Sequence, residues 1–174
     1  MAGTNSMQKT VRDMVLSLAV IVLVAGVVWL LNTQEDGDPD LKRVDYRVDL
    51  LTARRAAPYP VAAPVGLPEE WKPTSVRYRG ADGDAWHLGY HAPDGEYVAV
   101  EQSTGKRAVF IRSKTQGAEK TDVTQQIDGE TWTRYDGDHY DALVLEGTDG
   151  STTLVTGTGS FGQLTKMAEA LRTE

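Results

Sequence analysis

The sequence predicts an α+β protein in which a single N-terminal transmembrane helix precedes a mostly antiparallel sheet flanked by helices. Three observations lead to this expectation. An uncharged and largely apolar run of eighteen residues stands at 14–31. After residue 80, Asp-Gly pairs recur between short strand-like runs. The chain then closes with a segment whose apolar residues recur at helical spacing.

The apolar run reads MVLSLAVIVLVAGVVWLL and contains neither charge nor proline. At a rise of about 1.5 Å per residue it reaches about 27 Å as a helix, close to the hydrocarbon thickness of a bilayer. It exceeds the apolar core of a usual signal peptide, and no small-residue cleavage site follows it. We therefore expect residues 14–31 to be an uncleaved, single-pass membrane anchor.

The charges on either side of the run indicate its orientation. Lys9 and Arg12 flank it directly, whereas residues 32–40 contain no basic residue, and Trp29 stands near the far interface. This asymmetry predicts a cytoplasmic tail at 1–13 and a plasma-membrane location with the C-terminal part outside. The acidic stretch 32–43 is expected to be a linker. Residues 44–174 would then form one extracytoplasmic α+β domain.

The second half of the chain carries the strand signals. Asp-Gly pairs favour the tight turns of hairpins, so neighbouring strands should be antiparallel. The alternation is clearest at 85–91, where Trp86, Leu88 and Tyr90 would share one face. The expected strands span residues 75–79, 85–91, 96–102, 123–127, 131–135, 142–146 and 152–156.

The segment between the linker and the strands is ambiguous. Alternation over 44–50 suggests a strand, but we expect a short helix over about 50–57, capped by Asp49 and stopped by Pro58. The prolines that follow predict an extended run along the surface, from which Val61 and Val65 would reach the core.

Two further helices are expected. One lies near 106–112 within the segment 103–116, although residues 109–111 would also suit a strand. The other follows a capping box formed by Ser160 and Gln163. Its apolar face would consist of Phe161, Leu164, Met167, Ala168 and Leu171.

Composition excludes several classes of function. The net charge is −7, and after Asn32 there are sixteen basic and twenty-four acidic residues, so nucleic acid and anionic lipid should be repelled. The chain has no cysteine, which removes disulfides, thiolate metal sites and a cysteine nucleophile. No cofactor is expected.

The chemical motifs are weak. Residues 157–162 read G-x-G-x-x-G, but the chain supplies no following parallel strand and no acidic residue to hold a ribose, so we expect a glycine-rich strand exit with Ser160 as a cap. Asp136, Asp138 and Asp141 are weak candidates for a hard cation, although a solvated hairpin loop accounts for them better. His87 and His91 are about 13 Å apart along a strand, too far to share a metal ion.

Aromatic residues are the remaining candidates for function. Core packing would account for most of them, because large rings dominate burial in small domains. If two or three shared an exposed face, they would bind a peptide or a glycan. The residues considered for such a surface are Trp86, Tyr90, Trp132 and Tyr135.

Several short motifs together resemble one known family. They are the N-terminal anchor, the run from Pro58 to Val61, residues 67–71 (LPEEW), residues 101–103 (EQS), Gly129 with Trp132, and Gly157 before the last helix. They resemble an actinobacterial family of membrane-anchored envelope proteins known as domain of unknown function 4245. The resemblance implies an exported domain with a sandwich similar to the PsbP and Mog1 group, and it brings no activity and no site residues.

These observations lead to an expected function without a catalytic site. We expect a non-enzymatic accessory or binding module held by the lipid bilayer at the outer face of the plasma membrane, with another membrane or cell-wall protein as its partner. The alternatives are a hydrolase acting on cell-wall polymer and a sensor domain for a small ligand or cation.

Overall fold

The computed structural model describes residues 14–27 and 42–173, which fall into two separate units. Residues 14–27 form a helix with exposed side chains. Across the described residues, no helix has the length and apolarity needed to cross a membrane. The predicted span continues to residue 31, and its last four residues, like the predicted tail and most of the predicted linker, lie outside the described residues.

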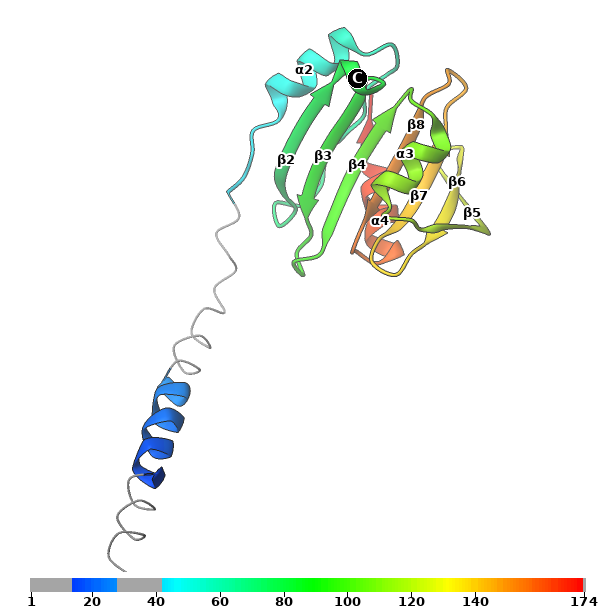
Figure 1. The fold of residues 1–174 in the computed structure, drawn as a ribbon. Coiled ribbons are helices and arrows are strands. Elements are labelled where there is room, and N and C mark those ends of the chain that lie inside the picture. Colours follow the sequence, from blue (N-terminus) through cyan, green and yellow to red (C-terminus); the bar gives the residue numbers. More distant parts are fainter. Residues whose placement is uncertain (1–13, 28–41, 174) are drawn as a thin grey trace, which may run out of the picture. The chain divides into compact units, whose positions relative to one another are not determined.

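The second unit is built on a seven-stranded antiparallel sheet, as the sequence predicts (Figure 1). The strands on its two sides form separate meanders, and β4 joins β8 where the meanders meet. The spatial order is β2 (Lys72–Arg79), β3 (Ala85–His91), β4 (Tyr97–Ser103), β8 (Thr152–Gly157), β7 (Asp141–Glu146), β6 (Glu130–Asp136) and β5 (Glu119–Ile127).

Helices cover both faces of this sheet. The helices α2 (Arg47–Ala56) and α4 (Phe161–Ala170) contribute to the main core, and α3 (Arg107–Lys114) lies on the opposite side (Figure 1). We call these two sides the α4 face and the α3 face. The helix expected near 106–112 is therefore confirmed. It begins one residue later than expected, at Arg107, and ends two residues later, at Lys114.

Strand alternation sorts side chains between the two faces. Trp86, Leu88 and Tyr90 of β3 share one face, as predicted, and all three are buried in the main core. A smaller core under α3 contains Phe110, Ile111, Ala142, Val144 and Leu154. The turns match the sequence signal, since Asp128 and Gly129 both have positive φ (50° and 83°) in the two-residue hairpin between β5 and β6.

The last helix begins where the capping box predicts. The backbone N–H of Ser160 donates to Oε1 of Gln163 (2.8 Å), and the N–H of Gln163 donates to Oγ of Ser160. The helix buries Leu164, Met167 and Ala168 against the sheet.

Two local predictions are wrong. The helix expected over 50–57 begins at Arg47 after Tyr46, and Asp49 lies in its first turn instead of capping it, where its charge still suits the helix dipole. Val61 is buried (1% exposed), but Val65 is 62% exposed, because the chain pairs with the end of α4 at this point and turns away at Gly66.

The glycine-rich exit from β8 permits a close backbone approach. The N–H groups of Thr158 and Gly159 both donate to the carbonyl oxygen of Tyr97. A Cβ atom placed on Gly157 would lie 1.9 Å from that oxygen. The glycine is therefore needed for contact between β8 and β4.

We predict that Gly157→Ala lowers the free energy of unfolding by about 1–3 kcal/mol, because backbone must move to relieve the overlap. Urea unfolding of the full chain in detergent, followed by tryptophan fluorescence, measures the change. Gly162→Ala, within α4, is the matched control. Outside the helix backbone, the nearest atom to its added Cβ is Oγ of Ser160, at 3.8 Å. Equal stability of Gly157→Ala and the wild type would contradict the prediction.

Candidate functional site

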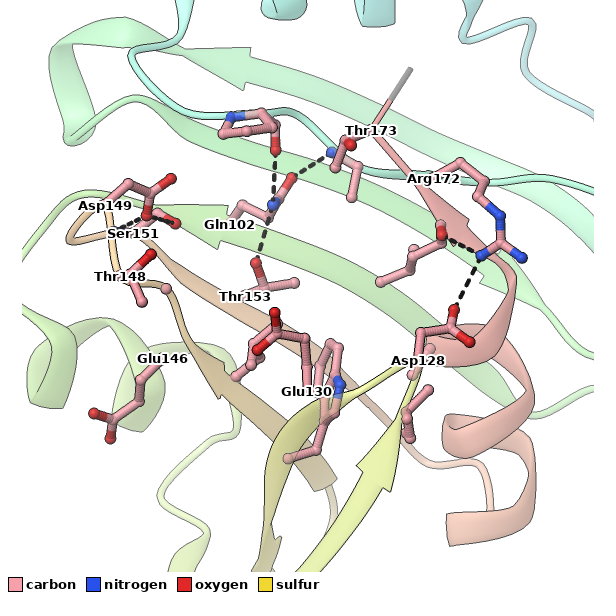
Figure 2. A pocket seen from close by; sticks show the side chains of 18 of the residues that line it. Gln102, Asp128, Glu130, Glu146, Thr148, Asp149, Ser151, Thr153, Arg172 and Thr173 are labelled. Atoms are coloured by element: carbon pink, nitrogen blue, oxygen red, sulfur yellow. Dashed lines mark hydrogen bonds and ion pairs between the residues drawn. The ribbon is translucent and has the colours of Figure 1, made fainter.

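A cavity of about 760 Å³ opens on the α4 face at one end of the sheet (Figure 2). Its walls come from segments far apart in the sequence: the proline-rich segment after α2, the β7–β8 turn and the chain after α4. A two-stranded ladder between β1 (Ala63–Pro64) and β9 (Leu171–Arg172) joins the first and last of these walls. The volume is that of a small-molecule or side-chain site.

One buried side chain fixes the proline-rich wall. Oε1 of Gln102 accepts from the backbone N–H of Ala62 (2.7 Å), and its Nε2 donates to the carbonyl of Pro60 (3.3 Å) and to Oγ1 of Thr153 (3.0 Å). Nε1 of Trp86 donates to the carbonyl of Ala62 (3.0 Å). Because both backbone groups of Ala62 are held by buried partners, the wall has a defined position.

The inner surface of the cavity combines apolar and polar groups. Trp132 and Leu145 contribute from the sheet, and Ala168 contributes from α4. The exposed Val65 stands on the proline-rich side. Gln102 already uses both donors of its amide in bonds to the protein. A ligand would therefore meet the apolar side chains of these walls beside the polar groups nearer the opening.

Acidic groups surround the opening, and most are already engaged. Asp128 pairs with Arg172 (3.3 Å). Hydrogen bonds from the hydroxyl and backbone N–H of Ser151 lower the pKa of Asp149. Glu146 points away from the cavity in Figure 2 and pairs with Arg107 of α3 (2.7 Å).

Glu130 is the exception among these carboxylates. It lines the cavity and is exposed, and its carboxylate has no ion-pair or hydrogen-bond partner among residues 42–173 (Figure 2). An unpaired carboxylate beside a cavity with apolar side chains on its walls can pair with a cation on a ligand whose remaining part is apolar.

The aromatic residues considered for a binding surface do not share an exposed face. Trp86 and Tyr90 are in the main core, where their size is accommodated between the sheet and its helices. Trp132 is also buried, although its side chain lines the cavity. Tyr135 packs on the opposite, α3 face. Only Trp132 of the four therefore belongs to the candidate site.

The acidic loop after β6 does not gather its carboxylates. Asp136 and Asp141 lie on the two strands of the hairpin, and Oδ1 of Asp141 accepts from the N–H of Gly137 (3.2 Å). Within the described parts of the chain, no three His, Asp or Glu side chains are placed to hold a metal ion. Asp138 remains an exposed loop residue.

Sequence reasoning missed Gln102 and Glu130. Gln102 stands two residues after the apolar run YVAV on the face that Val98 and Val100 share, which is a signal for a buried hydrogen-bonding role. Nothing in the sequence distinguishes Glu130 from the other carboxylates. Only the structure shows that Arg172, which lies forty-two residues later at the same cavity, pairs with Asp128 and not with Glu130.

These features define an α+β domain with a seven-stranded antiparallel sheet and a ligand-sized cavity at one end. The chain belongs to the family described as "Protein of unknown function (DUF4245)", which it matches over residues 7–171. No curated protein and no solved structure matches the chain. The resemblance noted in the sequence is thereby confirmed at the level of the family.

We predict that Gln102→Leu lowers the free energy of unfolding by about 1–3 kcal/mol, because it leaves the buried N–H of Ala62 without its partner. Chemical denaturation of the full chain measures the loss. The control is Gln126→Leu, whose exposed amide bonds only to Thr131 and whose loss should change stability by less than about 0.5 kcal/mol. If the two variants lowered the free energy of unfolding equally, the hydrogen bonds of Gln102 would not be what holds the proline-rich wall in place.

Proposed function

We propose that this chain is a membrane-anchored, extracytoplasmic accessory module of the cell envelope that binds another membrane or cell-wall protein. The observation that carries the proposal is the cavity beside the unpaired Glu130. The apolar side chains on its walls and the acidic groups at its opening suit a segment of a partner that presents a basic side chain next to an apolar one. The excess of acidic residues in the domain would favour such a partner during encounter.

The membrane part of the proposal rests on the sequence. The uncharged run at 14–31, with Lys9 and Arg12 before it, supports a single-pass anchor with a cytoplasmic N-terminus. The linker would hold the domain away from the lipid headgroups. We further propose that the sheet and its helices correspond to a sandwich of the PsbP and Mog1 group.

Site-specific photocrosslinking in intact cells tests the partner. A photoreactive amino acid in place of Val65, at the exposed edge of the cavity, should give one defined adduct that Glu130→Lys abolishes. Glu119→Lys is the matched charge control, because it makes the same change in net charge on the neighbouring strand β5, at the end far from Glu130.

A second control uses the α3 face. The same photoreactive residue in place of Val109, which is as exposed as Val65, should not give that adduct. An adduct that forms equally from both positions, or that persists unchanged in Glu130→Lys, would contradict binding through the cavity.

Protease treatment of whole cells tests the topology. We predict that the domain is digested in intact cells whose outer layers admit the protease, while the N-terminal tail stays protected, because the anchor crosses the membrane once. The protein should also remain in the membrane fraction after an alkaline wash. Release of a mature form lacking the first thirty residues into the culture fluid would contradict the anchor.

A further inference from the structure

The α3 face carries a hydrogen-bonded series of side chains from three adjacent strands. Nδ1 of His87, on β3, lies 2.7 Å from Oε1 of Glu101 on β4. Nε2 of the same imidazole lies 2.9 Å from Oγ of Ser75 on the edge strand β2. Both distances are those of good hydrogen bonds, so a hydroxyl, an imidazole and a carboxylate are aligned in that order.

The burial of the three groups increases along the series. Ser75 is part-exposed, the side chain of His87 is 22% exposed, and that of Glu101 is 6% exposed. Oε2 of Glu101 lies 2.8 Å from Nζ of Lys114 at the end of α3, as an ion pair without well-directed hydrogen-bond geometry. Glu101 is thus held from both sides.

The contacts define the tautomer of His87. A carboxylate only accepts, so Nδ1 of His87 donates to Glu101. Nε2 of the neutral ring is then an acceptor, and the hydroxyl of Ser75 donates to it. This arrangement directs the proton of Ser75 toward a base, which is what activation of a serine requires.

A second hydroxyl converges on Ser75. A Cβ placed on Gly89 would lie 2.4 Å from Oγ of Ser75 and 2.5 Å from the hydroxyl of Tyr97, so the glycine leaves room for both oxygens above β3. The two hydroxyl oxygens are therefore neighbours on this face of the sheet. Burial raises the pKa of Tyr97 to about 12, and the phenol therefore remains a donor at neutral pH.

From this geometry we propose that Ser75, His87 and Glu101 form a second, hydrolytic site on the α3 face, which cleaves short-chain carboxylic esters. Ser75 is the nucleophile and His87 is the general base. Glu101 is a positioning residue that fixes the tautomer and orientation of His87. The hydroxyl of Tyr97 donates to the oxyanion. The site lies on the opposite face of the sheet from the cavity and does not depend on partner binding there.

The reaction balances with water as the only co-reactant. Oγ of Ser75 adds to the ester carbonyl carbon while Nε2 of His87 takes its proton. The tetrahedral intermediate collapses with cleavage of the C–O bond, and His87 returns the proton to the departing alkoxide. Water, deprotonated by His87, then attacks the acyl-serine. The carboxylic acid leaves, and Ser75 recovers its proton.

The surroundings indicate the class of ester. Ser75 lies on a partly exposed strand surface, which suits a short acyl group such as acetyl better than a long chain. The ring of Tyr97 has its centroid 6.2 Å from that of Tyr140. These two half-buried rings, tilted by 34° to each other, offer an aromatic surface for a cyclic alcohol as the leaving group, such as a sugar ring.

The test uses the full chain in detergent with two probes, 4-nitrophenyl acetate and an alkyl fluorophosphonate. We expect the fluorophosphonate to modify Ser75, as located by peptide mass spectrometry. Ser75→Ala and His87→Gln should lose the label and lower ester hydrolysis at least a hundredfold. Glu101→Gln should lower kcat at least tenfold with KM unchanged, which a merely structural role would not produce.

The control is Ser113→Ala on the exposed side of α3. It should keep labelling and hydrolysis at the wild-type level, and thermal unfolding should show that Ser75→Ala remains folded. Absence of label on the wild type, label at another residue, or unchanged hydrolysis by Ser75→Ala would overturn the proposal. A Glu101→Gln variant with a lower Tm and unaltered kinetics would refute the assigned role of Glu101.

Discussion

The described domain depends on how Ala62 is held. Its N–H is bonded to Gln102 and its carbonyl to Trp86, so the proline-rich segment is fixed to two central strands through groups that water does not reach. Proline itself has no N–H to donate, and this segment has little backbone pairing of its own. The hydrogen bonds of Gln102 and Trp86 therefore hold the segment against the sheet, as backbone ladder bonds do between strands. The segment held in this way forms one wall of the cavity.

The end of β4 connects the two proposed sites. Glu101 and Gln102 are consecutive, and strand alternation sends them to opposite faces. Gln102 supports the cavity under the proline-rich wall, whereas Glu101 orients His87 on the α3 face. Both side chains are buried and polar, and both are held by defined partners. One strand thus provides rigid support for a binding site on one side and a reactive hydroxyl on the other.

The fold was largely predictable, and the sites were not. Asp-Gly turns and period-two alternation locate the strands because they are local properties of the chain, as the match at 85–91 shows. The capping box at Ser160 is equally local. By contrast, the exposure of Val65 follows from its contact with the distant end of α4. The pairing of His87 with Glu101 requires the register of β3 with β4, which periodicity does not supply.

The sequence by itself determined the family, the α+β class, the antiparallel pairing and the last helix, because these depend on local propensity, turn chemistry and motif content. Only the tertiary structure decided which polar residues are buried together. Ser75, His87 and Glu101 meet across three strands, and Gln102 reaches a segment forty residues before it. The physical reason is that such contacts are set by strand register and by chain closure over long separations, neither of which is encoded in neighbouring residues.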